Sequence, residues 1–123
     1  MKTIVVKVAQ FILGLFMAVI GLNKFHVFIE IPNPPGDGGE LMRIYIASGF
    51  LKMVGILEMV GGLTLVLNKF VPIGLTLITA IMFNATAFHL LYDPPGAGPA
   101  LLSSLLSLTL IYIYKHRFKD YWN

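Results

Sequence analysis

The sequence contains no cysteine and few charged residues, and both absences narrow what the protein can do. Without cysteine the chain forms no disulfide and offers no thiol for redox chemistry, for an iron–sulfur cluster or for a cysteine-ligated zinc ion. Charged residues make up only 12% of the chain and the formal net charge is +3, which is too little for a basic face that binds nucleic acid. We therefore expect no nucleic-acid partner and no metal site, because the one alternative, a haem held by His26 and His89, would lie close to the outer surface.

Apolar residues are abundant instead, making up 57% of the 123 positions and giving a mean hydropathy of +0.82. A soluble domain of this length has too small a core to hide so much apolar surface. A helix needs about 20 mainly apolar residues to cross a bilayer. The sequence therefore predicts one all-α transmembrane domain over residues 1–123, a four-helix bundle in contact with the lipid bilayer. The predicted spans are residues 3–25, 43–67, 72–91 and 99–114.

The breaks between these spans are rich in proline and glycine. Residues Pro32 to Glu40, PNPPGDGGE, predict a loop, because three prolines and three glycines disfavour both a regular helix and a paired strand. A tight turn at residues 68–72 and the sequence DPPGAGP at residues 93–99 separate the later spans. The last span carries small polar residues that suit hydrogen bonding and close packing between membrane helices. These are Ser103, Ser104, Ser107 and Thr109.

Two of the breaks share a PPG-x-G pattern, at residues 34–38 and 94–98, and the similarity extends around them. Residues 14–41 and 74–101 are identical at eight of 28 positions. If this is an internal repeat, two helical hairpins run in parallel and both loops lie on one side of the membrane. The alternative is that both turns acquired proline and glycine independently, since turns favour these residues.

Basic residues flank the spans unevenly, which predicts an orientation. Six lie beside one side of the predicted bundle, and only Lys24 and Arg43 lie near the other. Because positive residues favour the cytoplasmic side, we expect a multi-pass protein of the inner (plasma) membrane with both termini in the cytoplasm. The six are Lys2, Lys7, Lys69, Lys115, Arg117 and Lys119. We interpret the aromatic residues on that side as an interfacial belt: Tyr112, Tyr114, Tyr121 and Trp122.

Two charged residues, Lys52 and Glu58, lie inside the predicted second span. An ionised side chain at mid-membrane costs roughly 2.5–3.5 kcal/mol on insertion scales. We therefore expect both side chains to face the bundle interior and to find partners on other spans. The candidate partners are Asn84, Ser103 and Ser104 for Lys52, and Thr79 and Ser107 for Glu58. The glycines flanking Glu58 would let a neighbouring backbone or a flat ligand come close: Gly55, Gly61 and Gly62.

Polar residues of three spans fall at similar depth. At a rise of about 1.5 Å per residue, Lys24, Asn84 and His89 lie in the same half of the bundle as Lys52, with Glu58 nearest the midplane. These five residues are the candidate ligand-binding site, and the sequence assigns a catalytic role to none of them. The alternative is that they satisfy one another as a packing device, with Lys24 reaching toward the membrane surface.

Three short motifs occur in order along the spans: GLNKF at residues 21–25, EMVGG at residues 58–62, and N-x-x-x-x-H at residues 84–89, followed by DPPG at residues 93–96. With these motifs the sequence resembles the DoxX family of small four-helix bacterial membrane proteins over almost the whole chain. The resemblance implies a four-helix bundle in which Lys24, Glu58, Asn84 and His89 take the family's polar positions. Lys52 matches no position in that pattern.

The resemblance also implies a functional context. Some relatives are linked to quinone-dependent oxidation, for example as the membrane subunit of a thiosulfate:quinone oxidoreductase, so it implies quinone as a cofactor and a redox partner protein. The first hypothesis is thus a membrane component of a redox-associated system, with Glu58 as proton acceptor and His89 or Lys52 as donors to a quinone. The alternatives are a carrier or binder of a small polar or lipid-like molecule, and a structural assembly subunit without catalysis. A homo-oligomer is compatible with all three hypotheses.

Overall fold

The computed structural model describes residues 2–30 and 33–122, and side chains for residues 3–30 and 33–118. The described residues form helices and connecting turns and contain no strand, which confirms the all-α prediction. The elements are α1 (Lys2–Phe25), α2 (Gly36–Ser48), α3 (Phe50–Leu67), α4 (Val71–Tyr92), the 3-10 turn η1 (Pro94–Gly96), α5 (Ala97–Ile113) and α6 (Lys115–Trp122).

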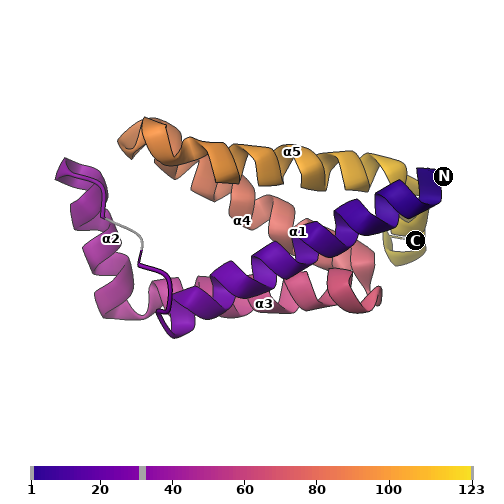
Figure 1. Ribbon diagram of the computed structural model, residues 1–123, viewed down its shortest axis with the longest axis horizontal. Helices are drawn as coiled ribbons and strands as arrows, with labels where there is room; N and C mark the ends of the chain where they lie inside the picture. The colour runs from indigo at the N-terminus through magenta and orange to yellow at the C-terminus, as the bar shows by residue number, and fades with distance from the viewer. Residues whose placement is uncertain (1, 31–32, 123) are drawn as a thin grey trace.

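Four long segments form an antiparallel bundle, and both termini lie at the same end of it (Figure 1). The helices long and apolar enough to cross a membrane cover residues 3–25, 50–67, 71–92 and 94–113. Their outward side chains are large and apolar: Phe83 is 72% exposed, Leu91 75% and Leu102 70%. Such a surface suits lipid rather than water. The chain is therefore a multi-pass integral membrane protein.

The second span is shorter than the sequence predicts. Instead of one helix from Arg43 to Leu67, the chain forms α2 and α3, separated at Gly49, whose φ of +83° ends α2 in the left-handed region. Helix α2 stands across the end of the bundle opposite the termini (Figure 1). The predicted loop also ends early, at Pro35, because prolines are compatible with the start of a helix. Only α3 is left to span the membrane in this part of the chain.

Helices α1 and α3 cross at two pairs of glycines. A Cβ added to Gly21 would lie 2.5 Å from the carbonyl oxygen of Gly55, and one added to Gly14 would lie 2.7 Å from that of Gly62. Both pairs are seven residues apart on their helices, which keeps them on one face over two turns. The absence of side chains therefore sets how closely and at what rotation α1 and α3 pack.

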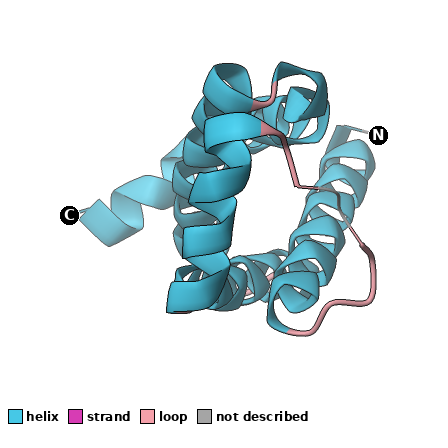
Figure 2. Ribbon diagram, turned by 90° about the vertical axis from the view of Figure 1, so that its left-hand side faces the viewer, coloured by secondary structure: helices cyan, strands magenta, loops and turns pink. Residues whose placement is uncertain are grey.

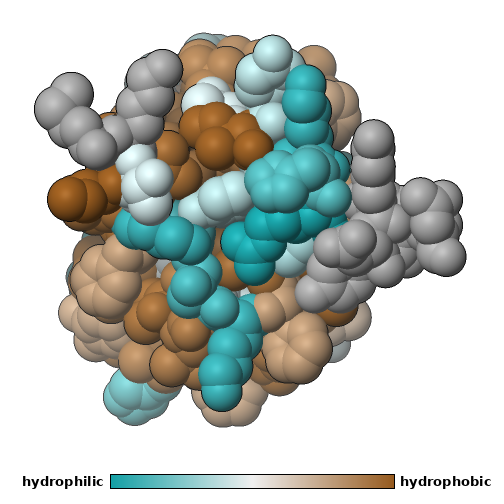
Figure 3. All heavy atoms as spheres, turned by 90° about the vertical axis from the view of Figure 1, so that its right-hand side faces the viewer, coloured by the Kyte–Doolittle hydropathy of each residue, from teal (hydrophilic) through white to brown (hydrophobic). Residues whose placement is uncertain are grey.

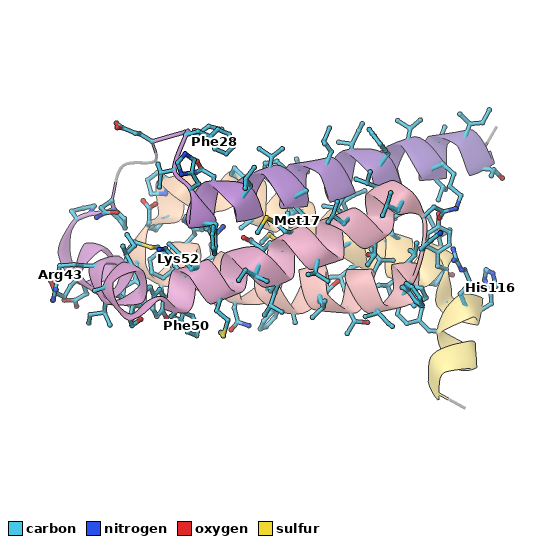
Figure 4. All side chains as sticks on the ribbon, turned by 90° about the horizontal axis from the view of Figure 1, so that it is seen from below. Met17, Phe28, Arg43, Phe50, Lys52 and His116 are labelled. Carbon is cyan, nitrogen blue, oxygen red and sulfur yellow. The ribbon has the colours of Figure 1, made fainter. Side chains whose placement is uncertain are left out.

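The remaining packing joins this pair to α4 and α5. Leu13 and Met17 of α1 are buried with Leu75 and Ile78 of α4 and with Leu110 of α5. Met17 points inward between the helices (Figure 4). Viewed from the end that carries α2, the long helices are arranged around the axis of the bundle and α6 projects away from it (Figure 2). The core is thus formed by aliphatic and methionine side chains in the middle of the membrane.

Both PPG loops lie at the end of the bundle that α2 covers. A Cβ on Gly38 would lie 2.8 Å from the Cβ of Tyr92, so the start of α2 packs against the end of α4, directly before η1. Any antiparallel four-helix order places these loops together, so the internal repeat stays a prediction. The halves also differ, because α2 has no counterpart after the second PPG, where α5 begins at once.

Candidate functional site

Glu58 is buried in the middle of α3 and faces Lys24 of α1. The residue is 1% exposed, and Lys24 Nζ lies 2.7 Å from its Oε1, while the Lys24 side chain is 25% exposed. The two groups form an ion pair between α1 and α3. Neither carboxylate oxygen accepts a hydrogen bond from a described residue. The prediction that Glu58 faces the bundle interior is confirmed.

The glycine crossing explains why these two residues meet. Gly21 lies one turn before Lys24, and Gly55 lies one turn before Glu58, so the same faces of α1 and α3 carry both pairs. A Cβ on Gly55 would lie 2.9 Å from the Cβ of Lys24. Because the helices are antiparallel, the Lys24 side chain reaches back from Gly55 along α3 toward Glu58.

The partners that the sequence suggested for Glu58 are engaged elsewhere, so that prediction was wrong. Thr79 donates a hydrogen bond to the Ser107 hydroxyl at 3.0 Å, and the Ser107 hydroxyl donates to the Ser104 carbonyl at 3.0 Å. The hydroxyls of Thr86 and Ser104 lie 3.1 Å apart. The Thr79–Ser107 and Thr86–Ser104 contacts join α4 to α5, as expected for small polar residues in membrane helices. Thr109 is exposed and bonds only within its own helix.

The glycines beside Glu58 accommodate backbone rather than a flat ligand. The spaces above Gly55 and Gly62 are filled by the α1 backbone at Gly21 and Gly14. A Cβ on Gly61 would lie 3.0 Å from Ile78, so this face is occupied by α4. Of the pair, only the Lys24 side chain is partly exposed, so it is the member that a ligand can reach from the surroundings.

Lys52 and Asn84 do not join Glu58. Lys52 is exposed, contrary to the predicted interior position, and its Nζ lies 5.8 Å from the ring centre of Phe25. Asn84 is also exposed, and its Nδ2 donates to the carbonyl of Ala80 in the same helix at 2.9 Å. Hence Lys52 receives no hydrogen-bonding partner from Asn84, Ser103 or Ser104 among the described contacts.

His89 pairs with Asp93 where α4 gives way to η1. The distance between His89 Nδ1 and Asp93 Oδ2 is 3.4 Å, and Nδ1 is buried without a hydrogen bond from a described residue. A Cβ on Gly96 would lie 2.6 Å from the same Asp93 oxygen and 3.0 Å from His89 Nδ1. Because Gly96 has no side chain, the His89–Asp93 pair can occupy the space beside it. The described residues contain no group of three or more side chains suited to a metal ion.

A second polar group, near the termini and buried at Gln10 and Tyr114, was missed by the sequence interpretation. Tyr114 donates to Gln10 Oε1 at 2.6 Å, and Gln10 Nε2 donates to the Leu65 carbonyl at 2.9 Å and to Asn68 Oδ1 at 3.1 Å. Lys7 also donates to Asn68 Oδ1, at 3.0 Å. We call Lys7, Gln10, Asn68 and Tyr114 the Tyr114 cluster. The signal that could have found it is Gln10, a lone uncharged polar residue deep in an apolar run.

Tyr114 is therefore not part of an aromatic belt, because it is only 7% exposed. Tyr112, at 69% exposure, has the position expected of a belt residue. The side chains of Tyr121 and Trp122 lie outside the described residues.

Comparison with protein-family models, with curated proteins and with solved structures finds no match to the chain. Function is therefore argued from two polar groups, the Lys24–Glu58 pair and the Tyr114 cluster, and from the charge around them.

Proposed function

We propose that the protein is a DoxX-like membrane component of a redox-associated, quinone-linked system, with the Lys24–Glu58 pair as its polar intramembrane site. The observation that carries this proposal is the carboxylate of Glu58, which is buried among apolar helices with neither oxygen hydrogen-bonded within the described structure. Ionisable residues within membrane spans mark ligand or proton pathways by default, since placing them there is costly.

The pair offers both kinds of group that a quinone head recognises. A carboxylate accepts hydrogen bonds, as from a quinol hydroxyl, and an ammonium donates up to three, as to a quinone carbonyl. Lys24 is placed to be that donor because it is both beside Glu58 and partly exposed. This replaces the earlier hypothesis that Lys52 or His89 is the donor. A bound quinone would supply two-electron chemistry, and a redox partner protein would supply the electrons.

The test is whether quinone stays with the protein and depends on Glu58. Protein extracted in mild detergent is analysed for co-purifying quinone, and binding of decylubiquinone is then measured on the delipidated protein. We expect Glu58→Gln to fold normally and to lose most of both signals, since it keeps the shape but not the charge. Glu40→Gln is the matched control, because Glu40 is an exposed glutamate on α2.

Equal quinone retention by wild type and Glu58→Gln would overturn the proposal, as would a wild type that binds none. Uptake of a polar solute into proteoliposomes that is lost in Glu58→Gln would instead support the carrier alternative.

We also propose that the protein lies in the inner (plasma) membrane with both termini in the cytoplasm. The support is the difference in charge between the ends of the bundle, since Arg43 and Lys52 at the α2 end are accompanied by acidic residues and the basic residues at the other end are not, among the described side chains. Basic residues gather at the end with the termini: Lys7, Lys69, Lys115 and Arg117. Acidic residues gather at the end covered by α2: Glu30, Asp37, Glu40 and Asp93. Positive residues favour the cytoplasmic side of a membrane protein.

A further inference from the structure

Tyr114 presents its ring to two cations at the end of the bundle that carries the termini. Its backbone closes α5, and its hydroxyl is held by Gln10 at 2.6 Å. Lys7 Nζ lies 5.3 Å from the ring centre, and the guanidinium carbon of Arg117 lies 5.1 Å from it. The ring therefore contacts a cation from α1 and a cation from α6.

The local structure explains how both cations are held. Lys7 is anchored to Asn68 Oδ1, and Asn68 sits in the left-handed region with a φ of 56°, which asparagine tolerates better than most residues. Arg117 follows the break between α5 and α6, and its backbone N–H donates to the Tyr114 carbonyl at 2.8 Å. This turn brings the guanidinium back over the ring of Tyr114.

Two like charges are thus held close together without a described carboxylate beside them. Both lie near one ring centre, so they are no more than about 10 Å apart, within the Debye length at 0.1 M salt. The described carboxylates are in the middle of α3 or at the opposite end of the bundle. The sequence adds Asp120 to α6, and its side chain lies outside the described residues. Hydrophilic side chains extend over this end face (Figure 3).

We propose that Lys7 and Arg117 form a binding site for the phosphate group of an anionic phospholipid, with Tyr114 as its rigid support. One of the three N–H donors of the Lys7 ammonium bonds to Asn68, which leaves two for a ligand, and the guanidinium of Arg117 has five N–H donors. Phosphate matches these donors, and arginine in particular binds it through paired N–H groups.

The position favours a lipid headgroup over a soluble anion. Tyr114 closes the last span, and its neighbour Tyr112 is 69% exposed, as expected at the boundary between hydrocarbon and headgroups. A cation at this boundary is within reach of the headgroup phosphates, and basic sites between membrane helices on the cytoplasmic side bind anionic lipids. The site is remote from Lys24 and Glu58, which lie in the other half of the bundle, so it stands independently of the proposed quinone function.

The test compares lipid retention by variants of matched charge. Purified protein is equilibrated with phosphatidylglycerol and an excess of phosphatidylcholine, and the lipids that remain bound are counted by native mass spectrometry. We expect wild type to retain phosphatidylglycerol in preference to phosphatidylcholine. In Arg117→Gln this preference should be about five-fold lower, which is the effect typical of one cation at a membrane surface. Lys7→Gln in the same background should lower it further.

Lys69→Gln is the matched control, since Lys69 is an exposed lysine at the same end but contacts no described ring. If Lys69→Gln reduces the preference as much as Arg117→Gln does, the attraction is diffuse and the site is overturned. Inorganic phosphate is then added at constant ionic strength. If phosphate displaces the lipid and chloride at the same ionic strength does not, the site is reassigned to a soluble phosphate compound. The melting temperature of each variant is measured to verify that the variant still folds.

Discussion

The ammonium nitrogen of Lys24 lies 2.7 Å from one carboxylate oxygen of Glu58, although the two residues belong to different helices and Glu58 is almost fully buried. The pair is asymmetric, because only Lys24 has access to the surroundings. Glu58 thus depends on a single cation for the compensation of its charge within the described structure. This dependence makes the pair testable by removing either partner.

Lys24→Met should destabilise the protein by about 3–5 kcal/mol, because it leaves the Glu58 carboxylate buried without its cation. Glu58→Leu in the same chain should recover most of this loss, since a buried ion pair can often be replaced by apolar side chains at little cost. Reversible unfolding of both single variants and the double variant in detergent gives the coupling free energy. Effects that simply add would show that Lys24 and Glu58 do not interact.

The glycine crossing predicts that added methyl groups at α1 are harmful. Gly21→Ala should cost about 1–3 kcal/mol, the range for overpacking, because its Cβ would lie 2.5 Å from the Gly55 carbonyl oxygen. Gly98→Ala is the control: it is a helical glycine with nothing within 4 Å of the added Cβ. That variant should be neutral or stabilising by up to about 1 kcal/mol. Equal melting temperatures for the two variants would contradict the close crossing.

Tyr114→Phe should cost about 1–3 kcal/mol, because it leaves the buried Gln10 carbonyl oxygen without its donor. Tyr112→Phe removes the same hydroxyl from a residue that is 69% exposed, so it should change the melting temperature little. The difference between the two variants measures the buried bond alone. A similar small effect of both would mean that Gln10 finds another donor.

The sequence predicted the spans well because apolar runs of this length have few alternatives. A membrane leaves no backbone group unbonded, so a run of about 20 apolar residues must become a helix. Helices α1 and α4 accordingly end within a few residues of their predicted limits. Helix α2 was missed because its start, PPG, also suits a loop, and because a single residue, Gly49, separates it from α3. One glycine inside an apolar pattern is a weak signal for a break.

The candidate site was only partly predictable. Depth placed Glu58 and Lys24 in the bundle, but the rotation of each helix decides which side chains meet. Lys52 and Glu58 are six residues apart, about 120° around α3, so the face that buries Glu58 turns Lys52 outward. That rotation is set by the packing of Gly55 and Gly62 against α1. The spacing of these glycines is visible in the sequence, but the sequence does not show which residues of α1 they contact.

The exposed pair of Glu40 and Arg43 on α2 predicts a pH effect outside the membrane. Hydrogen bonding to Arg43, together with its positive charge, holds the pKa of Glu40 below the ordinary value for glutamate. The contribution of this pair is therefore present above the ordinary glutamate pKa and is lost as the pH falls through the lowered one. In Arg43→Gln the pKa of Glu40 should rise toward its ordinary value, as measured by NMR titration of the carboxyl group. Lys52→Gln should leave the Glu40 titration unchanged.

The orientation can be tested directly because the chain has no cysteine of its own. Single cysteines at Asp37 and Gly98, both exposed at the α2 end, should react from outside intact cells with an impermeant thiol reagent. A cysteine at Lys69, at the end with the termini, should react only after the cells are opened. Gly98 is preferred to its neighbour Ala97, which is buried and would be unreactive on either side.

The physical basis of that labelling pattern is the separation of charge between the two ends of the bundle. Reversed labelling, with Lys69 reactive from outside, would place the Tyr114 cluster and Arg117 in the outer leaflet. The Lys24–Glu58 pair would then lie in the half of the membrane nearer the cytoplasm, since it is in the half of the bundle away from the termini. A cytoplasmic redox partner could then reach a ligand at that pair more directly than the proposed orientation allows.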